Sequence, residues 1–264
     1  MPGWTDAHNH LQDPRLGDPT PVIATMRAAG VARCVTNATR ETDWPAVEEL
    51  ALAHPDFVSP AFGIHPWQAH TVTDGWLDRL VKLLEIHPHA TIGECGLDQW
   101  VSSPPFAVQL PVFLAQLRLA HKIQRPLTIH CLKAWNALFV AFSEAPPPPT
   151  MLLHSFGGSI EIARRLIPFG AYFSFSGHFL HPRKAAVLEV FRQLPHDRIL
   201  LETDAPDMRP PDSLISHPIP NSLNHPANLP TIGRALAAAL KISPEKLAGL
   251  TRDNTTRCLG LRVF

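Results

Sequence analysis

Short apolar segments rich in β-branched and aromatic residues alternate with longer amphipathic segments along the whole chain. The short segments predict strands over residues 4–10, 31–38, 57–65, 90–98, 126–131, 150–156, 171–177 and 199–206. The longer segments predict helices over 22–30, 44–54 (with Asp43 as N-cap), 75–87, 106–122, 134–145, 160–170, 183–194 and 229–241, and one more over 243–260. A helix therefore follows each predicted strand.

This regular alternation predicts a parallel sheet, and eight strand–helix units in 264 residues fit one (β/α)8 TIM barrel of the α/β class. We expect residues 1–264 to form this single domain. A doubly wound open sheet is the alternative, but it predicts a glycine-rich turn after the first strand, and "HNHLQDPRL" has none. In a barrel the carboxyl ends of all strands surround one mouth, where barrel enzymes carry their active sites.

The composition of the chain argues against several classes of protein. Lys+Arg and Asp+Glu are 23 each, which argues against a broad basic surface that grips a long nucleic acid. The four cysteines are scattered without a C-x-x-C pair, as expected of free thiols in a reducing compartment. The chain starts without a signal-peptide pattern, and no apolar run approaches the roughly 20 residues that span a bilayer. We expect a cytoplasmic monomer that does not contact membranes.

Six potential metal ligands lie at or near the carboxyl ends of five predicted strands, although buried parallel strands are usually apolar throughout. They are His8 and His10, Glu94, His130, His154 and Asp204. In "TDAHNHLQD" the two histidines are two residues apart, so they point to the same face of a strand. Because the strand ends meet at the barrel mouth, these six side chains predict a metal site.

A set of four imidazoles and two carboxylates suits zinc, manganese, iron or nickel better than magnesium or calcium, because the latter two prefer ligand shells made of oxygen alone. The sequence alone does not distinguish Zn, Mn, Mg, Ni and Fe. Six ligands are too many for one tetrahedral ion with an open position, and they fit two divalent ions about 3.5–4 Å apart.

The strand order suggests how the six ligands are divided between the two ions. Glu94 is the expected bridging ligand, because it comes from the side of the barrel opposite the first strand. His8 and His10 would hold one ion with help from Asp204, and His130 with His154 would hold the other. Such ions lower the pKa of a bound water to about 7. Asp204 is placed to accept its proton, so Asp204 and Glu94 are the expected catalytic residues.

The motifs around these residues are "DAHNHL", "GIHPW", "IGECGLD", "PLTIHC", "LHSFGG" and "LLETDAP", in that order. Together they resemble the TatD family of metal-dependent hydrolases, often described as deoxyribonucleases, within the amidohydrolase-like barrel superfamily. The resemblance runs from about residue 5 to about residue 260. It implies a TIM barrel, the same six metal ligands, two divalent ions and hydrolysis of phosphodiester bonds, commonly at DNA ends.

The sequence departs from this family in two places. After the fifth-strand histidine the family commonly has Ser-Arg-acid, whereas here Leu132 takes the arginine position and Lys133 follows it. In the last loop, Arg-Asn-Glu-Pro becomes "LNHP": Asn224 is kept, while Leu223 and His225 replace arginine and glutamate. Arginine binds phosphate bidentately, so its loss at both places weakens the inference to a nucleic-acid substrate.

Substrate contacts are expected from His65 of "GIHPW", from Lys133 and from Asn224. Asp6 and Glu202 each lie two residues from a predicted ligand and are candidates to orient it.

Two functions follow from this picture. The first is a metal-dependent deoxyribonuclease that trims DNA ends or cleaves a small phosphodiester. The alternative is a binuclear amidohydrolase for a small-molecule ester, lactone or amide. A catalytically silent scaffold is a third reading, and the complete set of six ligands argues against it.

Overall fold

The computed structural model describes residues 3–261. Its strands are β1 (Trp4–Asn9), β2 (Val31–Asn37), β3 (Val58–Phe62), β4 (Thr91–Asp98), β5 (Leu127–Leu132), β6 (Met151–Leu153), β7 (Ala171–Ser176) and β8 (Ile199–Glu202). Its α-helices are α1 (Pro19–Ala29), α2 (Trp44–Ala53), α3 (Trp76–Ile86), α4 (Phe106–Ile123), α5 (Trp135–Glu144), α6 (Ile160–Leu166), α7 (Ala185–Gln193), α8 (Leu229–Ala239) and α9 (Pro244–Leu259). The predicted alternation is confirmed throughout.

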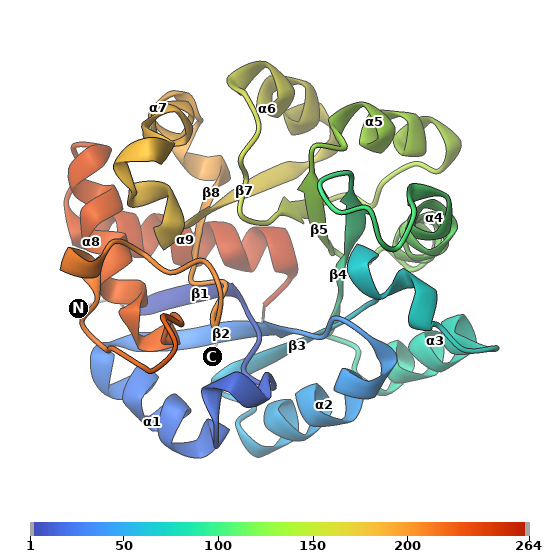
Figure 1. Cartoon of the computed structure of the whole chain (residues 1–264), viewed down its shortest axis with the longest axis horizontal. Helices are drawn as coiled ribbons and strands as arrows, with labels where there is room; N and C mark the ends of the chain where they lie inside the picture. The colour runs from blue at the N-terminus through green and yellow to red at the C-terminus, as the bar shows by residue number, and fades with distance from the viewer. Residues whose placement is uncertain (1–2, 262–264) are drawn as a thin grey trace.

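Each strand pairs in parallel with the next, in the order β1 to β8, and α1 to α8 follow one another around the outside (Figure 1). Two hydrogen bonds join the ends of the sheet, from Asp204 N–H to His8 O (3.0 Å) and from His10 N–H to Ala205 O (2.9 Å). The buried Asp6 carboxylate spans the same seam, where it accepts hydrogen bonds from the backbone N–H and the hydroxyl of Thr203. The fold is the predicted (β/α)8 TIM barrel.

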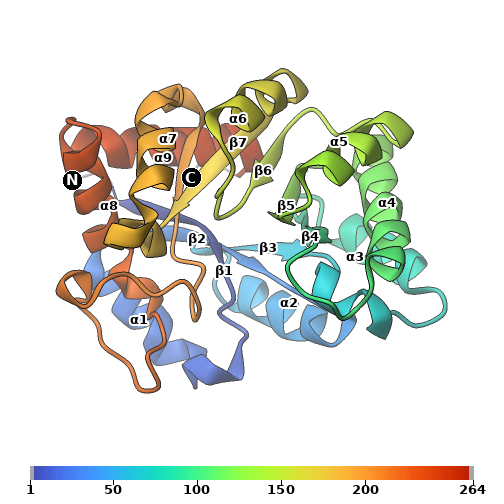
Figure 2. The same cartoon turned by 45° about the horizontal axis from the view of Figure 1, so that its top comes forward.

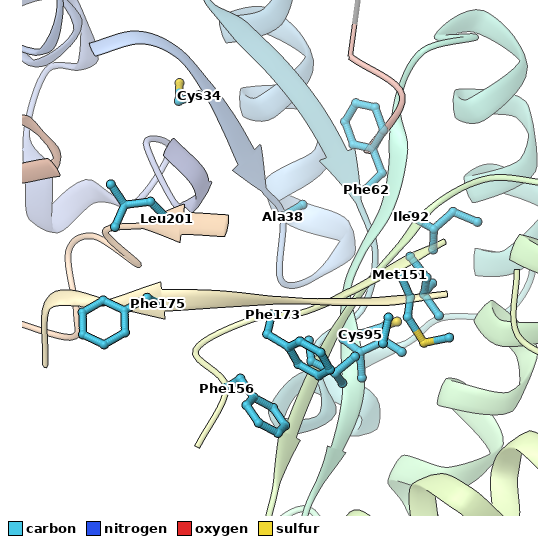
Figure 3. Packing of buried hydrophobic residues seen from close by; sticks show 14 of the residues in the cluster. Cys34, Ala38, Phe62, Ile92, Cys95, Met151, Phe156, Phe173, Phe175 and Leu201 are labelled. Atoms are coloured by element: carbon cyan, nitrogen blue, oxygen red, sulfur yellow. The ribbon is translucent and has the colours of Figure 1, made fainter. Parts of the chain in front are cut away.

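The main hydrophobic core lies between the strands and the outer helices. Figure 3 shows part of this layer, where Phe156 packs against Phe173 of β7 with 4.6 Å between ring centroids. A smaller cluster contains Leu152 and Leu200 together with Cys258 of α9. Because side chains alternate along a strand, Leu152 and Leu200 face the barrel interior.

Helix α9 closes one end of the barrel. The Thr150 hydroxyl, just before β6, donates to Cys258 O, and Asn254 Nδ2 donates to Ile199 O at the start of β8. The helix thus lies at the amino ends of these strands, which leaves the carboxyl ends as the open mouth. The long loop after β8 runs beside the segment that follows β1, as Figure 2 shows, and Arg15 pairs with Asp207 between them at 2.7 Å.

Several elements end earlier than the pattern predicts. Strand β3 stops at Phe62. Strands β6 and β8 stop at Leu153 and Glu202, just before the backbone turns through a positive φ at Ser155 and Asp204. Asp43 precedes α2, but its carboxylate does not cap that helix and instead accepts from Thr39 N–H. No helix within residues 3–261 has the length and apolarity needed to cross a membrane.

Candidate metal centre

The six predicted ligands meet in one cluster at the mouth of the barrel, with the Glu94 carboxylate at its centre. Glu94 Oε2 lies 3.2 Å from His8 Nε2, while Glu94 Oε1 lies 2.7 Å from His154 Nε2 and 3.2 Å from His130 Nδ1. Asp204 Oδ1 lies 3.4 Å from His10 Nε2. Glu94 therefore connects the histidines of β1 with those of β5 and β6.

Strand geometry explains this convergence. Residues 8, 94 and 130 belong to β1, β4 and β5, and residues 10, 154 and 204 follow the ends of β1, β6 and β8. Strands β4 and β5 approach closely because Gly96 has φ of 142°, and a Cβ built there would lie 1.9 Å from His130 O. Only glycine accommodates both this φ angle and this close contact. Gly96 therefore allows the neighbouring strands that carry Glu94 and His130 to pack side by side.

One imidazole has its tautomer fixed by the fold. His10 Nδ1 lies 2.7 Å from the Asn37 carbonyl oxygen, which accepts hydrogen bonds only, so Nδ1 carries the proton. When the ring is neutral, its Nε2 holds a lone pair, directed at Glu94 Oε2 and Asp204 Oδ1, each 3.4 Å away.

The tautomer of His130 is fixed in the opposite sense by Asp98, a fully buried residue of β4. Asp98 Oδ2 lies 2.8 Å from His130 Nε2 and also accepts from Trp67 Nε1 at 2.8 Å, while Oδ1 accepts from Trp100 N–H at 2.7 Å. These donors, with burial opposing them, lower the pKa of Asp98 to about 2, so it is a carboxylate. His130 Nδ1 therefore faces Glu94 with a lone pair.

Such a cluster, in which lone pairs of neutral imidazoles face carboxylate oxygens, requires cations between them. Burial disfavours protonation of His10, yet hydrogen bonding and attraction by Asp204 and Glu94 outweigh it and raise the pKa of His10 to about 9. Protons or metal ions can both supply this positive charge, and neutral imidazoles with carboxylates are ligands for divalent transition metals. The residues present therefore fit metal ions.

Among residues 3–261, three sets of His, Asp and Glu side chains have ligand atoms within 4.8 Å of one another. They are His8, His10 and Asp204; His65, Glu94 and His130; and His8, His154 and Glu202. The first matches one predicted half-site. The second places Glu94 and His130 together, as the predicted bridge requires, and adds His65.

His65 reaches the cluster as a hydrogen-bond donor. Its Nδ1 accepts from Trp67 N–H at 3.1 Å, so the proton lies on Nε2, which is 3.2 Å from Glu94 Oε1. Burial and neighbouring positive charge lower the pKa of His65 to about 4, in spite of attraction by Glu94. His65 is thus a neutral N–H donor that lines the mouth.

The other residues singled out from sequence lie in different places. Lys133 lines the mouth, with its ammonium 3.9 Å from the ring centroid of Trp100. Asn224 is fully buried and does not line it; its side-chain amide donates to Thr203 O at 2.9 Å. The predicted substrate contact by Asn224 is therefore replaced by a structural role in the β8 loop.

Glu202 accepts from the Ser155 hydroxyl at 2.5 Å and lies 3.8 Å from His154 Nδ1.

Asp6 contacts no imidazole and instead ties the seam of the barrel, as described above. Asp98 contacts the candidate ligand His130 and was not singled out from the sequence. The signal was its position in the "GECGLD" strand, four residues after Glu94 and therefore on the same strand face.

The cluster forms the floor of a cavity of about 890 Å³ at the mouth. Cationic side chains line its walls, namely Arg15, Arg40, Lys133 and Lys184. Arg15 is paired with Asp13 and Asp207, and Arg40 with Asp43. A cavity of this size can hold a small-molecule ligand.

Known proteins resemble this chain in sequence and in fold. The family model described as TatD related DNase matches residues 5–260. The chain is 32% identical to the 3′-5′ ssDNA/RNA exonuclease TatD of Edwardsiella piscicida, over 93% of this chain and 94% of that protein. It is 29% identical to the metal-dependent hydrolase YabD of Bacillus subtilis, over 96% and 97% of the two chains.

The crystal structure of YjjV, a TatD homologue from Escherichia coli, superimposes with a TM-score of 0.89 at 26% identity and covers 98% of both chains. A family match over residues 5–260, a relative above 30% identity and a cluster of side chains that could hold metal ions lead to one conclusion. The chain belongs to the TatD-related DNase family of metal-dependent hydrolases.

Proposed function

We propose that this protein is a two-metal phosphodiesterase that removes nucleotides from the ends of single-stranded DNA. The observation that carries the proposal is the pair of tautomer-fixed imidazoles, His10 and His130, whose lone pairs face Asp204 and Glu94. The names of relatives as 3′-5′ ssDNA/RNA exonucleases support the choice of substrate.

In this proposal the ligands divide into two half-sites. His8, His10 and Asp204 would hold one divalent ion, and His130 and His154 the other, with Glu94 between them. Two such ions generate a nucleophile from water and stabilise the charge that develops on a phosphoryl group. Zn, Mn, Mg, Ni and Fe are the ions to be compared.

The protein's own groups would complete the chemistry. In the metal-free protein His10 is protonated on both ring nitrogens and donates from Nε2 to Asp204. Burial opposes ionisation of Asp204, but this hydrogen bond and the charges of the surrounding imidazoles lower its pKa, so it is a carboxylate that can accept a proton. The Nε2–H of His65 would donate a hydrogen bond to a phosphate oxygen. Lys133 would contribute a positive charge at the rim.

The proposal takes residues 1–264 as one domain that works as a monomer. All four cysteines are free, which fits a reducing compartment such as the cytoplasm.

A second candidate is hydrolysis of a small ester, lactone or amide, because Leu132 lines the mouth where the family commonly has arginine. One experiment separates the two. Chelator-stripped protein is refilled with Zn, Mn or Mg and given a 5′-labelled single-stranded oligonucleotide, a p-nitrophenyl ester and a lactone. A ladder of products shortened from one end supports the exonuclease. A protein that binds metal, cleaves the ester or lactone and leaves the oligonucleotide intact would support the second candidate.

A further inference from the structure

Three large apolar side chains are exposed on one side of the cavity mouth. Trp100 is 63% exposed, Trp67 is 44% exposed and Leu132 is 40% exposed, and all three line the cavity. Trp100 follows β4, Trp67 follows β3 and Leu132 is the last residue of β5, and these three strands are neighbours. Large apolar residues that are exposed together beside a candidate active site indicate a surface for a ligand.

Both tryptophans are fixed to the metal centre through one carboxylate. Trp67 Nε1 donates to Asp98 Oδ2, and the Trp100 backbone N–H donates to Asp98 Oδ1. The Trp67 ring also lies 6.1 Å from the His130 ring, centroid to centroid. The aromatic surface therefore begins directly beside the candidate metal ligands, and its position is set by the same buried residue that orients His130.

The charge beside this surface is free to bind an anion. The Lys133 ammonium lies 3.9 Å from the Trp100 ring centroid, and among residues 3–261 no carboxylate lies within ion-pair distance of it. Arg15, across the mouth, is instead held by Asp13 and Asp207. Lys133 is therefore a cation beside the tryptophans that a substrate phosphate can reach without displacing a carboxylate partner.

We propose that Trp67, Trp100 and Lys133 form a stacking subsite for an unpaired nucleobase next to the scissile phosphate. Proteins bind single strands by combining aromatic stacking with cationic contacts to the backbone, and every base offers a π-face. The subsite would anchor the substrate in place of the arginine that the family commonly has at the position of Leu132. It rests on the proposed nuclease function and deepens it, because a base stacked here must leave its duplex, which predicts a preference for frayed or single-stranded ends.

The test compares two 5′-labelled single-stranded oligonucleotides that differ only at the two 3′-terminal positions, which are nucleosides in one and abasic in the other. For the wild type, kcat/KM should be about tenfold higher for the oligonucleotide that carries bases, as one stacked base would give. Trp100→Ala should bring this ratio close to one, and Trp100→Phe should restore most of it. Leu52→Ala, which removes an apolar side chain that is 66% exposed and lies outside the cavity lining, is the control.

Lys133→Met should raise KM for both oligonucleotides, because both carry phosphates. A ratio near one in the wild type, or a ratio that persists in Trp100→Ala, would overturn the subsite while the nuclease function stands. Failure of the wild type to cleave either oligonucleotide would overturn the nuclease function and the subsite with it.

Discussion

Replacing Asp98 with asparagine should weaken metal binding at the proposed site without removing any of its proposed ligands. The Asp98 carboxylate accepts four N–H groups, two on each oxygen. In asparagine the amide oxygen can serve the backbone donors Trp100 and Val101, but the NH₂ group then faces His130 Nε2–H. His130 relieves this conflict by moving its proton to Nδ1, the atom that faces Glu94 Oε1 at 3.2 Å, and it loses the lone pair that would bind an ion.

The size of the effect follows from the bond that is lost. A hydrogen bond to a charged group contributes about 1.5–3 kcal/mol. At about 1.4 kcal/mol per tenfold change, this corresponds to a loss of roughly 10- to 100-fold in metal affinity, which is also the range known for partners of metal-binding histidines.

The assay is a competition titration of Zn²⁺ or Mn²⁺ against a fluorescent chelator, with the thermal stability of the metal-free proteins measured in parallel. Trp67→Phe is the matched control, because it removes another donor to Asp98 Oδ2 and leaves the His130 tautomer unchanged; its metal affinity should stay within a few-fold of wild type. If Asp98→Asn bound Zn²⁺ and Mn²⁺ as tightly as the wild type does, the tautomer argument would be refuted.

Three further predictions concern stability. Removal of metal by a chelator should lower the melting temperature by about 5–10 °C, since an ion present at 100 times its Kd stabilises the fold by about 2.7 kcal/mol, and differential scanning fluorimetry that shows no shift would contradict the site. Burial and repulsion by His217 lower the pKa of His225 to about 4, whereas its unfolded value is near 6.5. The unfolded chain therefore binds a proton first, so stability falls as pH drops from 6.5 to 4, by about 2–3 kcal/mol. Urea unfolding at pH 4.5 and 7 should show a smaller loss for His225→Asn, which keeps an acceptor for Ala227 N–H; an equal loss in the two proteins would show that another group is responsible. Gly96→Ala should destabilise the fold by about 3 kcal/mol or more because its Cβ meets His130 O, whereas Gly157→Ala, with open space around it, should change urea unfolding by less than about 0.5 kcal/mol.

The barrel could be predicted because its signal is local and repeated. Each strand–helix unit has its own periodicity, and the convergence of His8, Glu94, His130 and Asp204 follows from parallel topology alone. The six residues expected at the mouth do meet there, and their part in binding metal remains a proposal.

Features that depend on register or exposure could not be predicted in the same way. Asp98 reaches His130 because Gly96 pairs with His130 and Asp98 with Leu132 across β4 and β5. Trp67 and Trp100 are large apolar residues of the kind that usually packs in a core, and only the structure shows that they are exposed. Asn224 occupies a motif position that suggests substrate contact, yet its buried bond to Thr203 is visible only in three dimensions.

The central claim is that the cluster around Glu94 binds two ions that drive phosphodiester hydrolysis. The most direct measurement titrates chelator-stripped protein with Mn²⁺ while cleavage of a single-stranded oligonucleotide is followed, with Asp204→Ala alongside. We predict that activity rises to a plateau at two equivalents of metal and that the variant stays folded, by circular dichroism, but inactive at every metal concentration. Full activity in the stripped protein, or in Asp204→Ala, would contradict the account.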